Sequence, residues 1–254
     1  MRMGRGGLLG RPMKISSVER NVLLCVLRTS RVGPIFIETV KEWSGSSRDV
    51  VRRVFEKFNL KDGEMLGSDD LLRIAVTLFG MNVSPEVLSV SLDWSLFEEL
   101  TSRIFENAGL NIMRNIQISI GKNKTQIDLL AFNEDTLYIV ECKRWRRSIT
   151  IGLIKTIESA MKRRILIMRE FLSKTIGEGE FEIRLIPLLL TVYGSPYFDD
   201  VLFHSPLRTL KSFLSEPAVS LPSPPLLKMR LKEPLMTCSL QSPYLKHLRR
   251  RLFD

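Results

Sequence analysis

Three ionisable residues interrupt strongly apolar stretches between residues 126 and 145. Asp128 lies in "QIDLLAF", while Glu141 and Lys143 lie in "YIVECKRW". Both stretches have the length and apolar content of β-strands, and the polar pair Glu134-Asp135 separates them. Burying a charge is costly unless it is paired, so a folding requirement alone would place apolar residues here. The pattern therefore predicts a chemical site.

Strand geometry predicts that the three side chains share one patch. Side chains alternate with a period of two, so Glu141 and Lys143 point to the same face. If Asn133 pairs with Thr136 around the turn, Asp128 lies directly across from Glu141. A slip of one residue would turn Asp128 to the other face. We therefore expect an even-length loop between the strands.

Two carboxylates held this close repel each other unless a cation lies between them. Lys143 can offset part of the charge, but a hard divalent ion with oxygen ligands fits better. Mg²⁺ is the usual candidate, with Mn²⁺ as its substitute. Lys143 could then orient or deprotonate an attacking water, or stabilise negative charge on a phosphate. In the alternative interpretation, Glu141 and Lys143 form a surface pair and Asp128 is a turn residue, which leaves the apolar flanks unexplained.

The surrounding sequence predicts a mixed α/β layer that would hold these strands. Asp93 can cap the first helix, which ends at Gly109. The expected elements are a helix at 94–108, strands at 111–120, 126–132 and 136–143, a helix at 150–173, a strand at 183–193, an irregular segment at 194–200, a strand at 201–206 and a helix at 207–214.

A separate helical unit is expected before this layer. Ser16 and Glu19 form a capping box that opens a helix. The expected elements are a helix burying Val18, Val22, Leu23 and Val26, a helix at 37–43, a helix at 48–58 capped by Ser47, a hairpin turn at 61–64 and a helix between Ser68 and Gly80.

This order resembles a winged helix-turn-helix domain. In that family the third helix enters the major groove, which here implies DNA contacts by Arg48, Arg52, Arg53 and Lys57. The alternative is a small helical domain whose basic face is only solvated.

The site itself resembles the PD-(D/E)XK nuclease superfamily. Asp128 matches the strand aspartate, and Glu141, Cys142 and Lys143 match E-x-K, although Ile127 replaces the proline of the motif. "FEELTSRIFENAGLNIMRN", "QIDLLAF" and "VECKRW" look like archaeal and bacterial restriction-endonuclease-like proteins of the Mrr type. The resemblance covers about residues 94–214 and implies a restriction-endonuclease-like mixed sheet flanked by helices, beside the small N-terminal winged helix-turn-helix-like domain.

The Mrr-type resemblance also implies a carboxylate from the first helix. There a Phe-Glu pair opens the helix and its glutamate joins the metal site, so Glu98 becomes the fourth site residue and third metal ligand. Glu99 is the second choice. Mrr-type proteins often carry a glutamine in the helix after E-x-K, and none occurs here, which makes Lys155 a candidate replacement.

Charge favours a polyanionic partner. The 254 residues carry a formal net charge of +10, and nucleic acid is the usual partner of such a chain, although basic solubility is the plainer interpretation. Basic residues near the site suit phosphate contacts, namely Lys122, Lys124, Arg144, Arg146 and Arg147. The run 162–164 is interpreted as a solvated helix face.

Cysteine and histidine usage excludes a zinc site. Three separated cysteines and two histidines form no metal-ligand pair, and free thiols fit a reducing cytoplasm. Cys142 is interpreted as a small core residue and His204 as structural.

No apolar run approaches the roughly 20 residues that cross a membrane. Abundant charged residues and three glutamines favour a thermophile.

These observations predict four regions: a disordered basic arm at 1–13, the winged-helix-like domain at 14–90, the nuclease domain at 91–215 and a proline-rich basic tail at 216–254. The predicted function is Mg²⁺-dependent hydrolysis of DNA by a homodimeric endonuclease. A Holliday-junction resolvase, another structure-specific DNA resolvase and a catalytically silent DNA-binding protein remain the alternatives.

Overall fold

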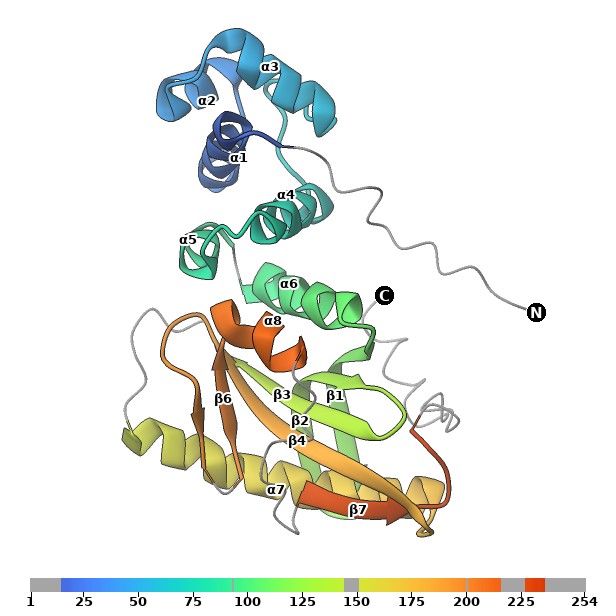
Figure 1. Cartoon of the computed structure of the whole chain (residues 1–254). Coiled ribbons are helices and arrows are strands. Elements are labelled where there is room, and N and C mark those ends of the chain that lie inside the picture. The colour runs from blue at the N-terminus through green and yellow to red at the C-terminus, as the bar shows by residue number, and fades with distance from the viewer. Residues whose placement is uncertain (1–14, 93, 144–150, 200, 216–226, 236–254) are drawn as a thin grey trace, which may run out of the picture. The chain divides into compact units, whose positions relative to one another are not determined.

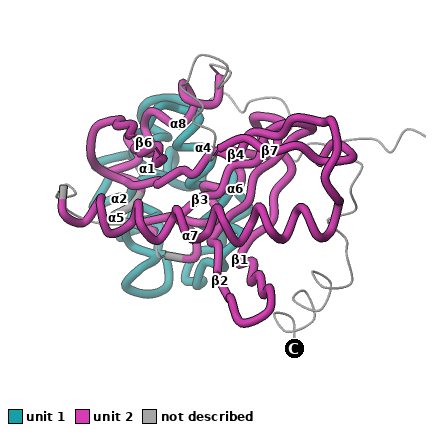
Figure 2. Tube along the Cα trace, turned by 90° about the horizontal axis from the view of Figure 1, so that it is seen from below, with its two compact units in different colours: residues 1–83 teal, residues 84–254 magenta. Residues whose placement is uncertain are grey.

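The computed structural model describes residues 15–92, 94–143, 151–199, 201–215 and 227–235. The chain divides into two compact units, residues 1–83 and 84–254 (Figure 2). The expected boundary lay at 90/91, whereas α5 (Pro85–Ser91) already belongs to the second unit. The expected arm at 1–13 and the expected cap Asp93 lie outside the described residues.

The described residues of the first unit, 15–83, form four helices: α1 (Ser17–Thr29), α2 (Ile37–Ser44), α3 (Arg48–Lys57) and α4 (Ser68–Gly80). The capping box of Ser16 and Glu19 opens α1 as predicted. Val22, Leu23 and Val26 are buried, but Val18 is 47% exposed. Val18 lies in the first turn of α1, before the buried part of the helix. The prediction that Val18 is part of the core was therefore wrong.

The expected hairpin at residues 61–64 does not form strands in the described part of this unit. A single antiparallel bridge joins Ile35 to Glu64, with the Gly63 N–H donating to the Ile35 carbonyl at 2.7 Å. Gly63 has a φ of 78°, which a tight turn requires and glycine supplies at little cost. The Asp62-Gly63 signal marks a turn correctly, but its flanks are too short to build a wing.

The second unit is a mixed sheet flanked by helices, as the fold class predicted. Its strands lie in the order β1-β2-β3-β4-β6-β5, and β7 pairs with β4. Figure 1 shows α7 on one face of the sheet and α6 and α8 on the other. The elements after α5 are α6 (Trp94–Asn107), β1 (Asn111–Ile120), β2 (Asn123–Phe132), β3 (Thr136–Lys143), α7 (Ile151–Ile176), β4 (Phe181–Thr191), β5 (Tyr197–Phe198), β6 (Phe203–Pro206), α8 (Leu207–Ser215) and β7 (Lys228–Leu231).

Strand β3 lies at the centre of the sheet. It pairs antiparallel with β2 and parallel with β4, so helices cover both of its faces. Every residue of β3 except Lys143 is buried. Pro187 in β4 costs little, because β7 pairs with residues 181–184 and β6 with residues 188–191, leaving the position of Pro187 between the two ladders.

Two strands were not expected. β5 occupies part of the segment predicted to be irregular, and β7 lies within the predicted tail at 216–254. In β7 the residues alternate between exposed and buried, from exposed Lys228 to buried Leu231. This period-two pattern spans four residues only, and the surrounding prolines and basic residues obscured it.

Candidate active site

The β2–β3 hairpin has the predicted register. Leu129 pairs with Val140 and Phe132 with Leu137, while the Asn133 N–H donates to the Thr136 carbonyl at 3.1 Å. The Asn133 side chain closes the turn by accepting from the Thr136 N–H at 2.9 Å. Continued by one step, this register sets Asp128 across from Glu141.

Asp128 lies where both neighbouring ladders are interrupted. The β2–β3 pairing ends at Leu129, and the Asp128 Oδ2 accepts the next hydrogen bond, from the Cys142 N–H at 2.9 Å. On the other side, the β1–β2 pairing skips Asn115, whose φ is 49°. Asn115 occupies the register position opposite Asp128 and tolerates this left-handed backbone better than most residues. At this position the side-chain carboxylate of Asp128, and not a backbone carbonyl of β2, accepts the hydrogen bond from β3.

Glu141 is the most enclosed member of the site, with a relative exposure of 6%. Lys143 Nζ lies 2.6 Å from its Oε1, and Arg164 Nη1 lies 2.7 Å from its Oε2. Arg164 extends from α7, and its Nε also donates to the Gln126 carbonyl at 3.1 Å. Each carboxylate oxygen of Glu141 therefore has a cationic partner.

Burial and charge repulsion act together on Asp128. Burial raises the pKa of its carboxyl first, and the neighbouring Glu141 carboxylate raises it further. The Cys142 N–H, Lys143 and Arg164 act in the opposite direction, but the pKa remains raised. At Asp128, burial and the charge of Glu141 therefore outweigh the opposing effects of the Cys142 N–H, Lys143 and Arg164.

Glu98 and Glu99, the two neighbouring glutamates of α6, have different surroundings. Glu98 on α6 is close enough for its charge to contribute to the raised pKa of the Cys142 thiol, after burial and Asp128. Glu99 is ion-paired with Arg103 at 3.2 Å and also with Arg114. Glu99 is therefore held by two guanidinium groups, and Glu98 remains the predicted ligand from this helix.

Cys142 is buried as predicted for a core residue. Burial raises the pKa of its thiol well above the ordinary value, and three nearby carboxylates act in the same direction. A thiol in this environment stays protonated and does not act as a nucleophile. Cys25 is also a buried free cysteine.

Asp128 and Glu141 offer the carboxylate oxygens that Mg²⁺ prefers as ligands. Among the described residues, no group of three or more histidine, cysteine, aspartate or glutamate side chains is arranged to hold a metal ion. Asp128 and Glu141 nevertheless supply two carboxylates at facing positions. Mg²⁺ is commonly held by one or two carboxylates, with waters and substrate phosphates completing its shell. The chemistry of the two carboxylates fits such an ion.

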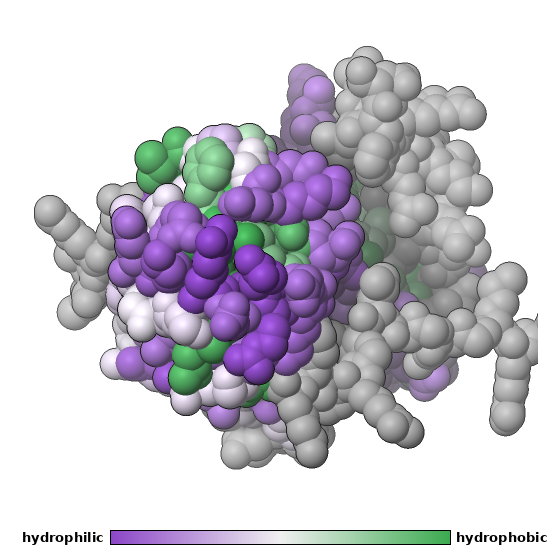
Figure 3. All heavy atoms as spheres, turned by 90° about the horizontal axis from the view of Figure 1, so that it is seen from above, coloured by the Kyte–Doolittle hydropathy of each residue, from purple (hydrophilic) through white to green (hydrophobic). Residues whose placement is uncertain are grey.

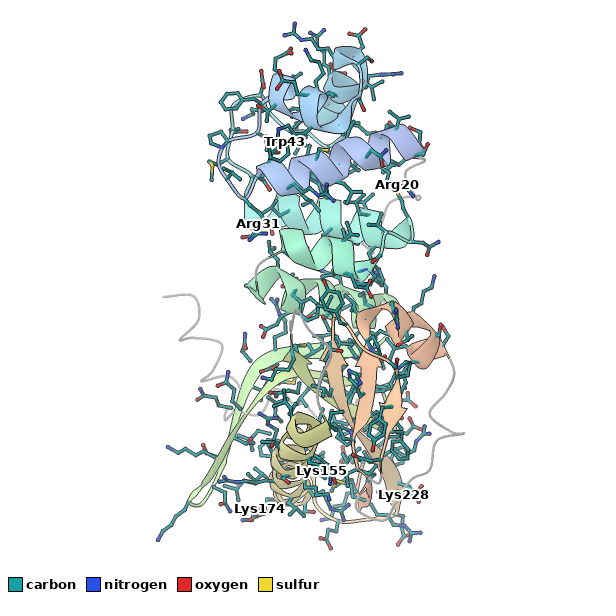
Figure 4. All side chains as sticks on the ribbon, turned by 90° about the vertical axis from the view of Figure 1, so that its left-hand side faces the viewer. Arg20, Arg31, Trp43, Lys155, Lys174 and Lys228 are labelled. Atoms are coloured by element: carbon teal, nitrogen blue, oxygen red, sulfur yellow. The ribbon has the colours of Figure 1, made fainter. Side chains whose placement is uncertain are left out.

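Arg164 is the site residue that sequence reasoning missed. The run 162–164 was interpreted as a solvated helix face, yet the Arg164 side chain is only 20% exposed and contacts Glu141. Lys155, the candidate for the missing glutamine, is exposed on α7 (Figure 4). It lies nine residues before Arg164, or roughly 13 Å along a helix. The signal available in the sequence was a basic residue in the helix after E-x-K. That helix contains several basic residues, and only the packing of α7 against the sheet distinguishes Arg164 from the others.

The predicted DNA-contacting residues fall into three groups. Lys122 and Lys124 are exposed at the β1–β2 turn, and the arginines at 144, 146 and 147 lie outside the described residues. The basic residues of α3 are all exposed, but Arg48 pairs with Glu38 at 3.1 Å and Lys57 with Glu19 at 3.0 Å. Arg52 and Arg53 form no ion pair with another described residue.

The described part of the first unit is close to neutral. Residues 15–83 contain 10 lysines and arginines and 9 aspartates and glutamates, a net charge of +1. Seen from the side that carries α2 and α3, hydrophilic side chains surround smaller hydrophobic patches (Figure 3). Trp43, labelled in Figure 4, is 59% exposed, and Phe36 is 50% exposed. Most of the net charge of the chain therefore lies outside residues 15–83.

Comparison with known families agrees with this geometry. Residues 89–170 match the Mrr_cat family, described as restriction endonuclease. Residues 89–170, within the second unit, are therefore similar to restriction endonucleases of the Mrr type. The matched segment contains Glu98 and the Asp128–Glu141–Lys143 patch and ends beyond Arg164. No curated protein matches the sequence. No helix in the described residues is long and apolar enough to cross a membrane.

Three solved structures are similar to this chain at low TM-scores. The small subunit R.BspD6I2 of the heterodimeric restriction endonuclease R.BspD6I is 15% identical, with a TM-score of 0.32, over 58% of this chain and 76% of that one. The protein of unknown function AF1548 is 15% identical, at 0.27, over 46% and 52%. Can2 from Sulfobacillus thermosulfidooxidans, in complex with cyclic tetra-adenylate, is 12% identical, at 0.30, over 80% and 54%. This chain spans about half the length of AF1548 and of Can2.

Proposed function

We propose that this Mrr-type unit is a Mg²⁺-dependent DNA endonuclease that hydrolyses phosphodiester bonds. One observation carries the proposal: the hairpin register sets Asp128 across from Glu141, with Lys143 Nζ 2.6 Å from the Glu141 carboxylate. The match of residues 89–170 to a restriction endonuclease family supports the same reaction class.

The carboxylates of the site and Lys143 would have separate roles in the reaction. Asp128 and Glu141 would hold the ion, and Glu98 from α6 would join them as a third carboxylate when the ion binds, because the described side chains form no three-ligand metal site without it. A bound Mg²⁺ supplies Lewis-acid polarisation of the phosphate and lowers the pKa of a coordinated water. Lys143 would position the attacking water and stabilise the negative charge that develops on the phosphate. Mn²⁺ would substitute for Mg²⁺ because it accepts the same oxygen ligands.

Substrate binding would rest on phosphate contacts around the site. Exposed Lys122 and Lys124 would contact the DNA backbone, together with the basic segment 144–147. The α3 face of the first unit, with Arg48, Arg52, Arg53 and Lys57, would add contacts. A homodimer would bring two sites to the two antiparallel strands of a duplex.

The test is cleavage of supercoiled, linear, single-stranded and four-way-junction DNA, with Mg²⁺, with Mn²⁺ and with EDTA. Wild type would be compared with Asp128→Asn and Lys143→Met, and with Lys174→Met as a matched control on the exposed surface of α7 (Figure 4). We expect metal-dependent cleavage in wild type and the control only. Equal activity in all four proteins would refute the site.

The preferred substrate would separate the remaining functions. Cleavage of four-way junctions in preference to linear duplex would identify a structure-specific resolvase. Retention of DNA without metal-dependent cleavage of any substrate would identify a silent DNA-binding protein.

A further inference from the structure

Both carboxylate oxygens of Glu141 are already paired with cationic side chains. Arg164 Nη1 lies 2.7 Å from Glu141 Oε2, while Lys143 Nζ takes the other oxygen at 2.6 Å. The Glu141 side chain is 8% exposed and that of Arg164 is 20% exposed, so water screens this pair only partly. Any cation that binds Glu141 must displace one of these partners or share an oxygen with it.

Lys143 and Arg164, the two cationic partners of Glu141, are held in place by different contacts. Lys143 lies two residues after Glu141 on the same strand, and its side chain is 31% exposed at the strand end. Arg164 comes from the helix that covers this face, and its Nε is also held by the Gln126 carbonyl at 3.1 Å. Because Gln126 lies two residues before Asp128 in β2, the guanidinium bridges the strand of one carboxylate to the side chain of the other.

We propose that Arg164 is a built-in counter-ion, which neutralises Glu141 when no metal is bound and exchanges with the divalent ion at this carboxylate. This proposal rests on the proposed function, because it assumes that Asp128 and Glu141 bind Mg²⁺ or Mn²⁺. Arg164 is then a positioning residue: it stabilises the metal-free carboxylate pair and lowers the affinity for the ion.

The physical reason is competition for one group. A buried carboxylate without a cationic partner is costly, so the metal-free site needs a positive charge beside Glu141. The same positive charge repels an approaching divalent ion and uses an oxygen that the ion requires. Removing the charge should therefore make the metal-free protein less stable and the binding of metal tighter.

The test is Mn²⁺ affinity, measured by electron paramagnetic resonance or calorimetry without DNA. Arg164→Met keeps much of the aliphatic length and removes the charge, while Arg164→Lys keeps the charge. Arg163→Met is the matched control, because Arg163 is exposed and forms no ion pair among the described residues. We expect Arg164→Met to bind Mn²⁺ about fivefold more tightly than wild type, the ratio that about 1 kcal/mol of lost competition would give. Arg164→Lys should stay near wild type and Arg163→Met should be unchanged.

A second measurement distinguishes exchange from a general structural effect. In the Glu141→Gln background, Arg164→Met should no longer change the affinity for Mn²⁺, because the carboxylate for which the two cations compete is gone. Without metal, Arg164→Met should lower the melting temperature, and saturating Mn²⁺ should raise it by more than in wild type. If Arg164→Met does not fold, Arg164→Gln retains an N–H donor for the Gln126 carbonyl and replaces it in both measurements.

The outcomes separate the two proposals. If wild type binds Mn²⁺ and the uncharged variant binds it equally or more weakly, the exchange is refuted while the metal site stands. Binding by the uncharged variant but not by wild type would support the exchange. Absence of binding in wild type and in the uncharged variant would refute the metal site and the exchange together.

Discussion

At the scale of single residues, the site is a compromise between stability and chemistry. Asp128 has a raised pKa because burial and Glu141 both disfavour its charged form. A carboxylate kept in such a place usually serves function, since a neutral residue would fold more easily. The cost is limited by the hydrogen bond from the Cys142 N–H to its Oδ2.

Asp128→Asn should therefore stabilise the metal-free protein while abolishing cleavage. Asparagine can still accept from Cys142 N–H but carries no charge beside Glu141. We expect the melting temperature at neutral pH to rise by about 2 °C, and cleavage to fall at least about 100-fold, as for the loss of a group that acts in the transition state.

The stability difference should depend on pH in one direction. A carboxyl whose pKa is raised by folding destabilises the native state above that raised pKa, and the penalty disappears below the ordinary pKa of the unfolded chain. The advantage of Asp128→Asn should thus shrink as the pH falls through the raised pKa. Thermal melts from pH 7 to pH 4 would measure it, and an advantage that grows toward acid would contradict this electrostatic account.

His204 gives the opposite dependence. Its side chain is 4% exposed, its Nε2 lies 2.7 Å from Thr191 Oγ1, and burial lowers its pKa. Protonation therefore favours the unfolded chain. Relative to His204→Gln, wild type should lose stability as the pH falls below about 6.5. Urea unfolding at pH 7.5 and 5.5 measures this, and a constant difference would show that His204 does not titrate on unfolding.

At the scale of elements, the hairpin was predictable because local rules determine it. The polar turn fixes the pairing of Asn133 with Thr136, and period-two alternation then sets Asp128 across from Glu141. Arg164 could not be chosen in the same way, because its contact depends on how α7 packs against the sheet. β7 was missed because four residues give a weak pattern, and the strand gains its stability from long-range pairing with β4.

The assignment of β7 to the sheet predicts a stability effect within the expected tail. Leu231 is fully buried and pairs with Phe181 in β4. Leu231→Ala should lower the free energy of unfolding by about 2–4 kcal/mol, the usual range for a buried leucine. Arg230→Ala, at the neighbouring exposed position, should change it by less than about 0.5 kcal/mol. Urea unfolding of both variants would decide, and equal small effects would show that β7 does not pack.

At the scale of the whole molecule, much of the net positive charge lies near the two ends of the sequence and not in the described helices of the first unit. The described first unit is nearly neutral, whereas residues 1–14 contain four basic and no acidic residues, and residues 236–254 contain four basic and one acidic residue. The order of the helices in the first unit was predictable from periodicity and from the caps of α1 and α3, whereas α4 begins at Ser68 and has Gly67 as its cap in place of the expected Ser68. A wing was not, because a turn signal does not specify the strands beside it.

The α3 face can be tested through the salt dependence of DNA binding. Arg52 and Arg53 are its arginines without an ion pair among the described residues. If they contact phosphates, Arg52→Ala/Arg53→Ala should reduce the slope of log affinity against log salt concentration by about 2. Lys174→Ala, on the exposed surface of α7, is the control. An unchanged slope would mean that the α3 face is only solvated.

The central claim is that Asp128 and Glu141 form one metal site. Its most direct test is a crystal structure of wild type with Mn²⁺, with anomalous diffraction recorded at the manganese edge. We expect a peak within about 2.5 Å of oxygens from both carboxylates, with the Arg164 guanidinium moved away from Glu141. A Glu141 carboxylate that remains paired with Lys143 and Arg164 at saturating Mn²⁺, with no peak between Glu141 and Asp128, would contradict it.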